Sequence, residues 1–340
     1  VSNTDVYDIA SLTKIVATLP NVMQEFDQGH LTLETKLKTM LPEAKNSNKA
    51  NATVLDMLTH QARFQPWIAF YKPTLDSLNR PSTKYYRSEF SDEFPVHVAD
   101  KLYLRKDYND TIVKTILDSE LLPKKQYKYS DFTFILFKEY LEQHNKKSLE
   151  DLAHDNFYES LGANSIMYNP LGKINANRVI PTENDTYFRH QLVQGYVHDM
   201  AAAMQGGVSG HAGLFANALD IAKLMQMYLQ KGSYGGKTYI TENTFRMFNT
   251  CYFCKDGNRR GVGFDKPQLG NEGPTCGCVS LTSFGHTGFT GTMTWADPEK
   301  EIVYVFLSNR TYPDSNATNK LSKENIRENI QKVIYEAIVE

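Results

Sequence analysis

The stretch Ser11-Leu12-Thr13-Lys14 stands at the start of a segment with helical periodicity. Behind it, apolar side chains recur three or four residues apart, at Ile15, Leu19, Val22 and Phe26. Asp8 can cap such a helix and Gly29 can end it. The pattern therefore predicts a helix over residues 8–30 with Ser11 in its first turn.

Ser11 and Lys14 are three residues apart, so on a helix they lie on one face within hydrogen-bond reach. A serine needs a proton acceptor to become a nucleophile, and a lysine whose pKa is lowered by burial can be that acceptor. Free amides at a helix start can stabilise an oxyanion. The pair also fits a surface serine beside a solvated lysine, so other motifs have to decide between the two interpretations.

The composition is that of an ordinary globular protein. The 340 residues are 41% hydrophobic and 22% charged, with a formal net charge of −2. No block of like charge suggests a nucleic-acid or membrane-surface partner, and no apolar run approaches the roughly 20 residues that span a bilayer. We expect a small molecule or a peptide as the partner and no nucleic acid.

The second half of the chain mixes helix and strand patterns. A glycine-rich passage at 206–213 lacks the ending of a phosphate loop and precedes a helix that Asn217 can cap. Alternating patterns predict strands at 261–264, 287–295 and 301–309, the last two joined as a hairpin through 297–300. Ser322 is then expected to cap a final helix whose apolar face packs on the sheet.

Two further motifs accompany Ser11 and Lys14. Tyr129-Ser130-Asp131 precedes an apolar helix, and His286-Thr287-Gly288-Phe289 lies in a predicted strand. In this order the motifs resemble those of the serine β-lactamase and penicillin-binding-protein superfamily, most closely its class C-like peptidase and esterase branch. Segments 58–62, 195–199 and 210–215 add similarity to the β-lactamase-like domain that follows a family 3 glycoside hydrolase in Bacteroidetes proteins.

The resemblance implies an α/β (α+β) fold: an antiparallel sheet flanked by helices, a mainly helical domain, and an active site in the cleft between them. We expect residues 1–15 and 200–340 to form the sheet domain and 16–199 the helical domain. Such proteins carry about fifty residues before the serine helix, so we expect N-terminal strands missing from this chain and a glycoside hydrolase domain upstream in the natural protein. The branch also implies a periplasmic, cell-surface or secreted location.

The resemblance assigns a role to each motif. Ser11 is the nucleophile, and Lys14 and Tyr129 share the duties of base and acid. Asp131 and the strand residues His286, Thr287 and Gly288 line the substrate cleft, and the backbone amides of Ser11 and Phe289 form the oxyanion hole. Tyr108, in Tyr108-Asn109-Asp110, is a rival for Tyr129 because it too precedes a helix.

Two departures from the family pattern affect the expected substrate, and a third affects a turn. Asp131 stands where β-lactamases have asparagine, which replaces an amide donor with a negative charge, and His286 stands where lysine is usual. Both changes argue against efficient β-lactam hydrolysis. Arg63 replaces a glycine, which strains the turn if the turn needs a positive φ.

Metal and cofactor sites are not expected. His198, His211 and His286 with Asp199 match no zinc spacing, so loop histidines that hydrogen-bond to the backbone are favoured. The chain has four cysteines, Cys251, Cys254, Cys276 and Cys278. They could form a zinc site, two disulfides or free thiols, and disulfides or free thiols are favoured over zinc.

The predicted function is a serine hydrolase that acts through an acyl-enzyme on a small amide or ester, such as a D-amino-acid peptide of cell wall. The alternative is a non-catalytic ligand-binding or interaction module beside a glycosidase.

Overall fold

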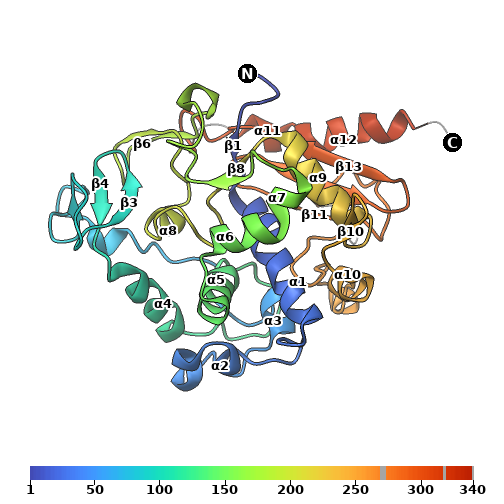
Figure 1. Cartoon of the computed structure of the whole chain (residues 1–340), viewed down its shortest axis with the longest axis horizontal. Helices are drawn as coiled ribbons and strands as arrows, with labels where there is room; N and C mark the ends of the chain where they lie inside the picture. Colours follow the sequence, from blue (N-terminus) through green and yellow to red (C-terminus); the bar gives the residue numbers. More distant parts are fainter. Residues whose placement is uncertain (269–272, 317–318, 339–340) are drawn as a thin grey trace.

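The structure is a computed structural model that describes residues 1–268, 273–316 and 319–338 (Figure 1). The helices are α1 (Leu19–Asp27), α2 (Leu37–Met40), α3 (Val54–Leu58), α4 (Tyr108–Asp118), α5 (Phe132–Asn145), α6 (Leu149–Ala153), α7 (Glu159–Leu161), α8 (Met200–Ala203), α9 (Ala218–Leu229), α10 (Glu242–Asn249), α11 (Lys320–Lys323) and α12 (Ile326–Glu336). The strands are β1 (Tyr7–Asp8), β2 (Tyr86–Arg87), β3 (Val96–Ala99), β4 (Leu102–Leu104), β5 (Met167–Tyr168), β6 (Glu183–Asp185), β7 (Gln191–Val193), β8 (Leu214–Ala216), β9 (Ser233–Tyr234), β10 (Lys237–Thr238), β11 (Phe284–Thr287), β12 (Met293–Asp297) and β13 (Ile302–Phe306).

The segment that contains Ser11 is helical from residue 10 to residue 27, as the periodicity predicts. It begins as a 3₁₀ turn (Ala10–Leu12), continues as a π-helix (Lys14–Thr18) and becomes α1. Ile15, Leu19 and Val22 are fully buried and Phe26 is partly buried, and α1 packs against α5 and α6 in the centre of the molecule (Figure 1). Burial on this face, rather than capping alone, holds the first turns in place.

A small sheet fixes the start of this helical run. β1 and β5 both pair antiparallel with β8, so Asp8 lies opposite Phe215. The Asp8 carboxylate accepts hydrogen bonds from the backbone amides of Ala10 (2.8 Å) and His198 (2.6 Å). The segment before Ser11 is therefore anchored to residues about two hundred positions later in the chain.

The sheet near the C-terminus has the strand order β11-β12-β13, and all of its pairings are antiparallel. The hairpin through 297–300 is confirmed, and the Asp297 carboxylate accepts the Glu299 amide in its turn. α9 packs on β12 and β13, and Met293, Trp295 and Tyr304 form a separate apolar cluster of the sheet. The mixed α/β architecture with antiparallel sheets is confirmed.

Several local predictions are wrong. Residues 261–264 form no strand, and residues 288–292 form a turn that separates β11 from β12. His286 therefore lies on β11 rather than on a strand of the hairpin. The small sheet β2-β4-β3 was not expected, because its strands are too short to show a clear alternation.

The final helix also differs from its prediction. Asn319, not Ser322, caps α11, and α12 begins only after Asn325, which has a left-handed backbone. In α12, Ile330, Val333 and Ile334 are exposed, while the polar Gln331 is buried and accepts a hydrogen bond from the Cys276 amide. The periodicity of the sequence predicted that this helix is amphipathic, but it did not predict which face of the helix packs against the rest of the protein.

None of the helices in the described ranges is both long and apolar enough to cross a membrane. The division into domains of 1–15 with 200–340 and of 16–199 stays a prediction, as do the strands expected upstream of Val1.

Candidate active site

Ser11 and Lys14 meet as the helical spacing predicts. Lys14 Nζ donates hydrogen bonds to Ser11 Oγ at 3.0 Å and to the carbonyl oxygen of His211 at 3.1 Å. The Lys14 side chain is fully buried, whereas Ser11 is partly exposed at the wall of a cleft. Ala10, directly before the serine, has a φ of 47°, a conformation that costs energy in a non-glycine residue and is common at functional sites.

The charge state of Lys14 differs from the prediction. Burial lowers the pKa of Lys14, but the Asp131 carboxylate, 2.7 Å from Nζ, and then Tyr129 outweigh burial and raise it above its usual value. The resting lysine is therefore an ammonium that donates to Ser11. The expectation of a free amine with a lowered pKa is wrong, because the sequence did not show that a carboxylate lies against the amine.

Tyr129 lies over the same lysine. Lys14 Nζ is 5.1 Å from the centre of the Tyr129 ring, and the Tyr129 hydroxyl is buried beside the amine. Burial raises the pKa of Tyr129 although Lys14 and Arg260 lower it, so the side chain is a neutral phenol. It can donate a proton, and Tyr129 lines the cleft.

The loop before α5 holds Tyr129 and Asp131 in position. Ser130 between them donates its backbone amide to His60 Nδ1 (3.2 Å) and its hydroxyl to the Gln65 carbonyl (2.6 Å). Tyr108, the rival candidate, instead donates its hydroxyl to the Phe70 carbonyl at 2.9 Å and does not line the cleft. The geometry therefore brings Tyr129, and not Tyr108, to Lys14.

The strand β11 and the turn after it form the opposite wall of the cleft. His286 is buried, its Nδ1 lies 2.7 Å from the Thr287 carbonyl oxygen, and burial lowers the pKa of this histidine well below its usual value. It is thus a neutral imidazole rather than a substitute for the cationic lysine. Phe289 is 55% exposed beside it.

The turn packs closely on the segment before Ser11. Thr292 Oγ1 donates to the Ile9 carbonyl (3.1 Å) and Thr290 Oγ1 to the Asp8 carbonyl (2.8 Å). A Cβ on Gly288 would lie 2.1 Å from Thr292 Oγ1 and 2.8 Å from the Ile9 oxygen, so only glycine fits. These contacts hold the turn that contains Phe289 against the segment directly before Ser11.

The cleft between these walls has a volume of about 1180 Å³. All the predicted site residues line it except Lys14, which is buried beneath Ser11. Sequence reasoning missed further lining residues that come from loops and from the C-terminal region; they are Trp67, Tyr127, Arg259, Arg260, Arg310 and Arg327. Two features of the sequence could have indicated these lining residues. They are the adjacent pair Arg259-Arg260 and Trp67, one of only two tryptophans.

Arg310 is the cation best placed to meet an anionic substrate. Its guanidinium stacks on the Phe289 ring at 4.4 Å, next to the predicted oxyanion hole. Burial, and then the neighbouring Arg327, lower the pKa of Arg310.

His198 and His211 each lie against a carboxylate. His198 Nε2 lies 2.9 Å from Glu183 Oε2, and His211 Nε2 lies 2.8 Å from Asp199 Oδ1. Asp131, Asp199 and His211 offer ligand atoms within 4.8 Å of one another, but the Lys14 ammonium contacts Asp131 there and already supplies a cation. His198 and His211 thus contact side-chain carboxylates, not the backbone groups expected, whereas His286 does contact a backbone carbonyl.

The four cysteines are paired as Cys251–Cys254 and Cys276–Cys278. Disulfide sulfurs are not the thiolates that zinc requires, so these residues do not form a zinc site in the structure.

The comparisons with known proteins agree with this geometry. The family model described as Beta-lactamase matches residues 1–325. The chain is 29% identical over 328 residues to the "Putative D-alanyl-D-alanine carboxypeptidase" of Escherichia coli (strain K12), over 90% of this chain and 69% of that protein. It is also 29% identical to the N-acetylmuramyl-L-alanine amidase of Bacillus subtilis (strain 168), over 90% of this chain and 68% of that protein.

The solved structures include a penicillin-binding protein homolog from Caulobacter crescentus, with a TM-score of 0.61 at 17% identity over 91% of this chain and 78% of that one. That likeness concerns the fold. The family match over nearly the whole chain goes further, and it shows that this chain belongs to the β-lactamase family, within the serine hydrolase superfamily of β-lactamase-like and penicillin-binding proteins.

Proposed function

We propose that this protein is a serine hydrolase that forms an acyl-enzyme on Ser11 and acts on small amides or esters, with D-amino-acid peptides of the cell wall as its natural class. The observation that carries the proposal is the 3.0 Å contact between Ser11 Oγ and a buried Lys14 at the wall of an open cleft. The names of the E. coli and B. subtilis relatives support the substrate class. A periplasmic or surface location follows from that class.

The first step needs a base, and the resting lysine is protonated. Lys14 therefore has to lose its proton before acylation, and the Asp131 carboxylate opposes that loss because it stabilises the ammonium. The neutral amine then takes the proton of Ser11. The serine oxygen attacks the carbonyl carbon, and the amides of Ser11 and Phe289 stabilise the oxyanion.

The second half of the reaction releases the leaving group. The Tyr129 phenol protonates the leaving amine or alcohol as its bond to the carbonyl carbon breaks, which is the usual task of a neutral acid at this place. Lys14, which carries the serine's proton, then returns a proton to the Tyr129 phenolate and becomes a neutral amine again. Water attacks the ester on Ser11 and gives its proton to this amine. The proton passes on to Ser11 Oγ as the bond to the carbonyl carbon breaks and the acid product leaves.

The substrate preference follows from the walls of the cleft. Arg310 beside Phe289 supports a substrate with a free terminal carboxylate, and the aromatic side chains of Trp67 and Tyr127 favour an extended acyl portion. Because Asp131 is no amide donor, we expect slow hydrolysis of penicillins and cephalosporins.

A panel of substrates tests the proposal. A chromogenic ester, a D-alanyl-D-alanine peptide and a chromogenic cephalosporin are incubated with the protein and with Ser11→Ala, and Ser88→Ala is the control because Ser88 is exposed and outside the cleft. We expect turnover of the ester and the peptide that Ser11→Ala abolishes and Ser88→Ala keeps. No turnover of any substrate would instead support the non-catalytic binding module.

A further inference from the structure

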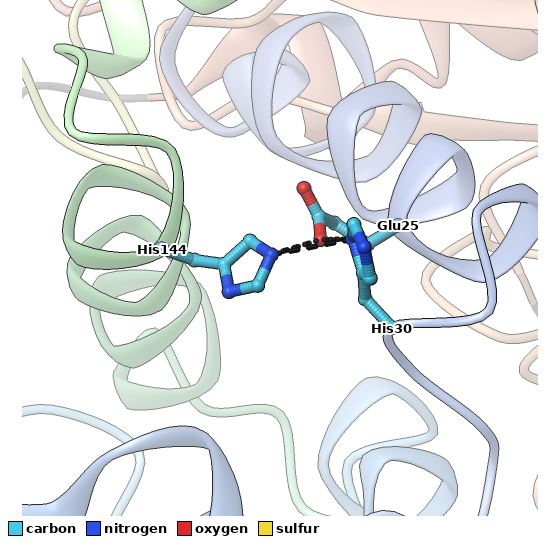
Figure 2. Close-up of side chains that lie close together, drawn as sticks. All are labelled: Glu25, His30 and His144. Atoms are coloured by element: carbon cyan, nitrogen blue, oxygen red, sulfur yellow. Dashed lines mark hydrogen bonds and ion pairs between the residues drawn. The ribbon is translucent and has the colours of Figure 1, made fainter.

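A second cluster of chemistry-bearing side chains lies at the far ends of the helices that hold the site. Glu25 is on α1, His30 follows α1, and His144 is in the last turn of α5 (Figure 2). Their ligand atoms lie within 4.8 Å of one another. The proposed mechanism uses none of these three residues.

Local structure brings the three side chains together. Gly29 has a φ of 76°, which turns the chain back after α1 so that the His30 amide donates to the Glu25 carbonyl at 2.9 Å. His144 stacks on Tyr140 with ring centres 5.4 Å apart, and this stacking orients its imidazole. The arrangement is thus fixed by backbone and ring packing.

The three ligand atoms have the spacing of metal ligands. His30 Nδ1 is 2.9 Å from Glu25 Oε2, His144 Nε2 is 3.4 Å from the same oxygen, and the two nitrogens are 3.2 Å apart. Ligands about 2.0–2.1 Å from a tetrahedral zinc ion are about 3.4 Å from each other. An ion at the centre of this triangle needs only small side-chain movements.

The charge of Glu25 gives a second, independent reason. Its side chain is only 4% exposed, and within the described residues it forms no ion pair with a lysine or arginine. A buried carboxylate normally has a cation as its partner. Tyr140 and Asn145 donate hydrogen bonds to its two oxygens at 3.3 and 3.0 Å, which orients the carboxylate in the way that outer partners orient metal ligands.

We propose that Glu25, His30 and His144 bind one zinc ion, through Oε2, Nδ1 and Nε2 respectively, with water as the fourth ligand. Imidazole with carboxylate favours zinc and related transition metals over calcium or magnesium. The side chains of His30 and His144 are 43% and 39% exposed, so an ion can reach them from solvent. The ion joins the end of α1 to the end of α5 and is structural, since the cleft is lined by other residues.

Titration of the metal-free whole chain with Zn²⁺ in a calorimeter tests this, with Co²⁺ as a spectroscopic probe. We expect one equivalent of zinc, visible bands of tetrahedral cobalt, and a melting temperature that rises with zinc concentration. His30→Ala and His144→Ala each weaken zinc binding at least about 100-fold, because loss of a direct ligand exceeds the 10–100-fold effect of losing an outer partner.

The control is His154→Ala, which removes an exposed histidine that also pairs with a carboxylate, 2.9 Å from Asp155, and should leave zinc affinity unchanged. Both ligand histidines are partly exposed, so their alanine variants are expected to fold, and circular dichroism checks this. No zinc binding by the unmodified chain would overturn the proposal. The proposal would also be overturned if His30→Ala and His144→Ala bound zinc as tightly as the unmodified chain does. The ion would then lie elsewhere, for instance near Asp131, Asp199 and His211.

Discussion

At the scale of single residues, Asp131 decides how Lys14 behaves. Its carboxylate, 2.7 Å from the amine, is the main reason that the pKa of Lys14 is raised rather than lowered by burial. In a relative with asparagine at this position, the effect of burial on the pKa of the lysine would dominate. The lysine would then lose its proton at a lower pH than it does beside Asp131.

Asp131→Asn should therefore move the pH dependence of acylation. The rate rises with pH as Lys14 loses its proton, and removal of the carboxylate lowers the pKa of Lys14, so the acidic limb of the rate profile moves to lower pH. The measurement is the rate of fluorophosphonate labelling against pH. Asp110→Asn, which removes an exposed negative charge on α4, should leave the limb in place. A limb that stays fixed or moves upward in Asp131→Asn would show that Asp131 does not control the base.

Arg310 is the residue for which we expect a specific effect on substrate choice. A charge-assisted hydrogen bond contributes about 1.5–3 kcal/mol, so Arg310→Gln should raise KM for a D-alanyl-D-alanine peptide roughly 10–100-fold. The same peptide with an amidated terminus should be unaffected, and Arg310→Lys, which keeps the charge, should recover part of the affinity. Equal effects on both peptides would mean that Arg310 does not bind the carboxylate.

At the scale of elements, the loop before α5 and the start of α4 carry the two candidate tyrosines. Tyr129→Phe should lower turnover roughly 10²–10⁴-fold, the usual contribution of general acid–base catalysis. Tyr108→Phe removes only a buried hydrogen bond to Phe70 and should lower the melting temperature with little effect on turnover. Steady-state kinetics and thermal unfolding of both variants separate the roles, and equal losses of turnover would show that the choice of Tyr129 is wrong.

The turn from β11 to β12 is the other element that shapes the site. Gly288→Ala places a methyl group against Thr292 and the Ile9 carbonyl, so the turn must move away from Ser11. We expect acylation to fall by about 10²–10³-fold, the effect of losing one oxyanion donor. The double variant with Thr292→Ala should recover part of the rate, because it removes the nearest clash. Labelling of Gly288→Ala at the unmodified rate would show that the turn does not set the oxyanion hole.

The elements also show what sequence patterns can and cannot predict. The helix behind Ser11, the capped helix after Asn217 and the hairpin through 297–300 were predictable because each has a strong local signal. The sequence also predicted strain at Arg63, which has a φ of 63°. The exposure of α12 was not predictable, since it depends on what the rest of the chain covers.

At the scale of the whole molecule, the candidate site was largely predictable because its motifs are short and lie at the starts of helices or on one strand. The Lys14–Asp131 ion pair, the arginines of the cleft and the Glu25–His30–His144 cluster were not. Each of them joins residues that are more than one hundred positions apart in the sequence or that come from loops without periodicity. Only the folded chain brings them together.

The central claim, acylation on Ser11, is tested most directly by labelling the whole chain with a fluorophosphonate and mapping the modified peptide by mass spectrometry. The account predicts one label, on the peptide that contains Ser11, and none in Ser11→Ala. It also predicts a slow reaction in Lys14→Met, because the serine then has no base. A label on another serine, or undiminished labelling of Ser11→Ala, would contradict the account.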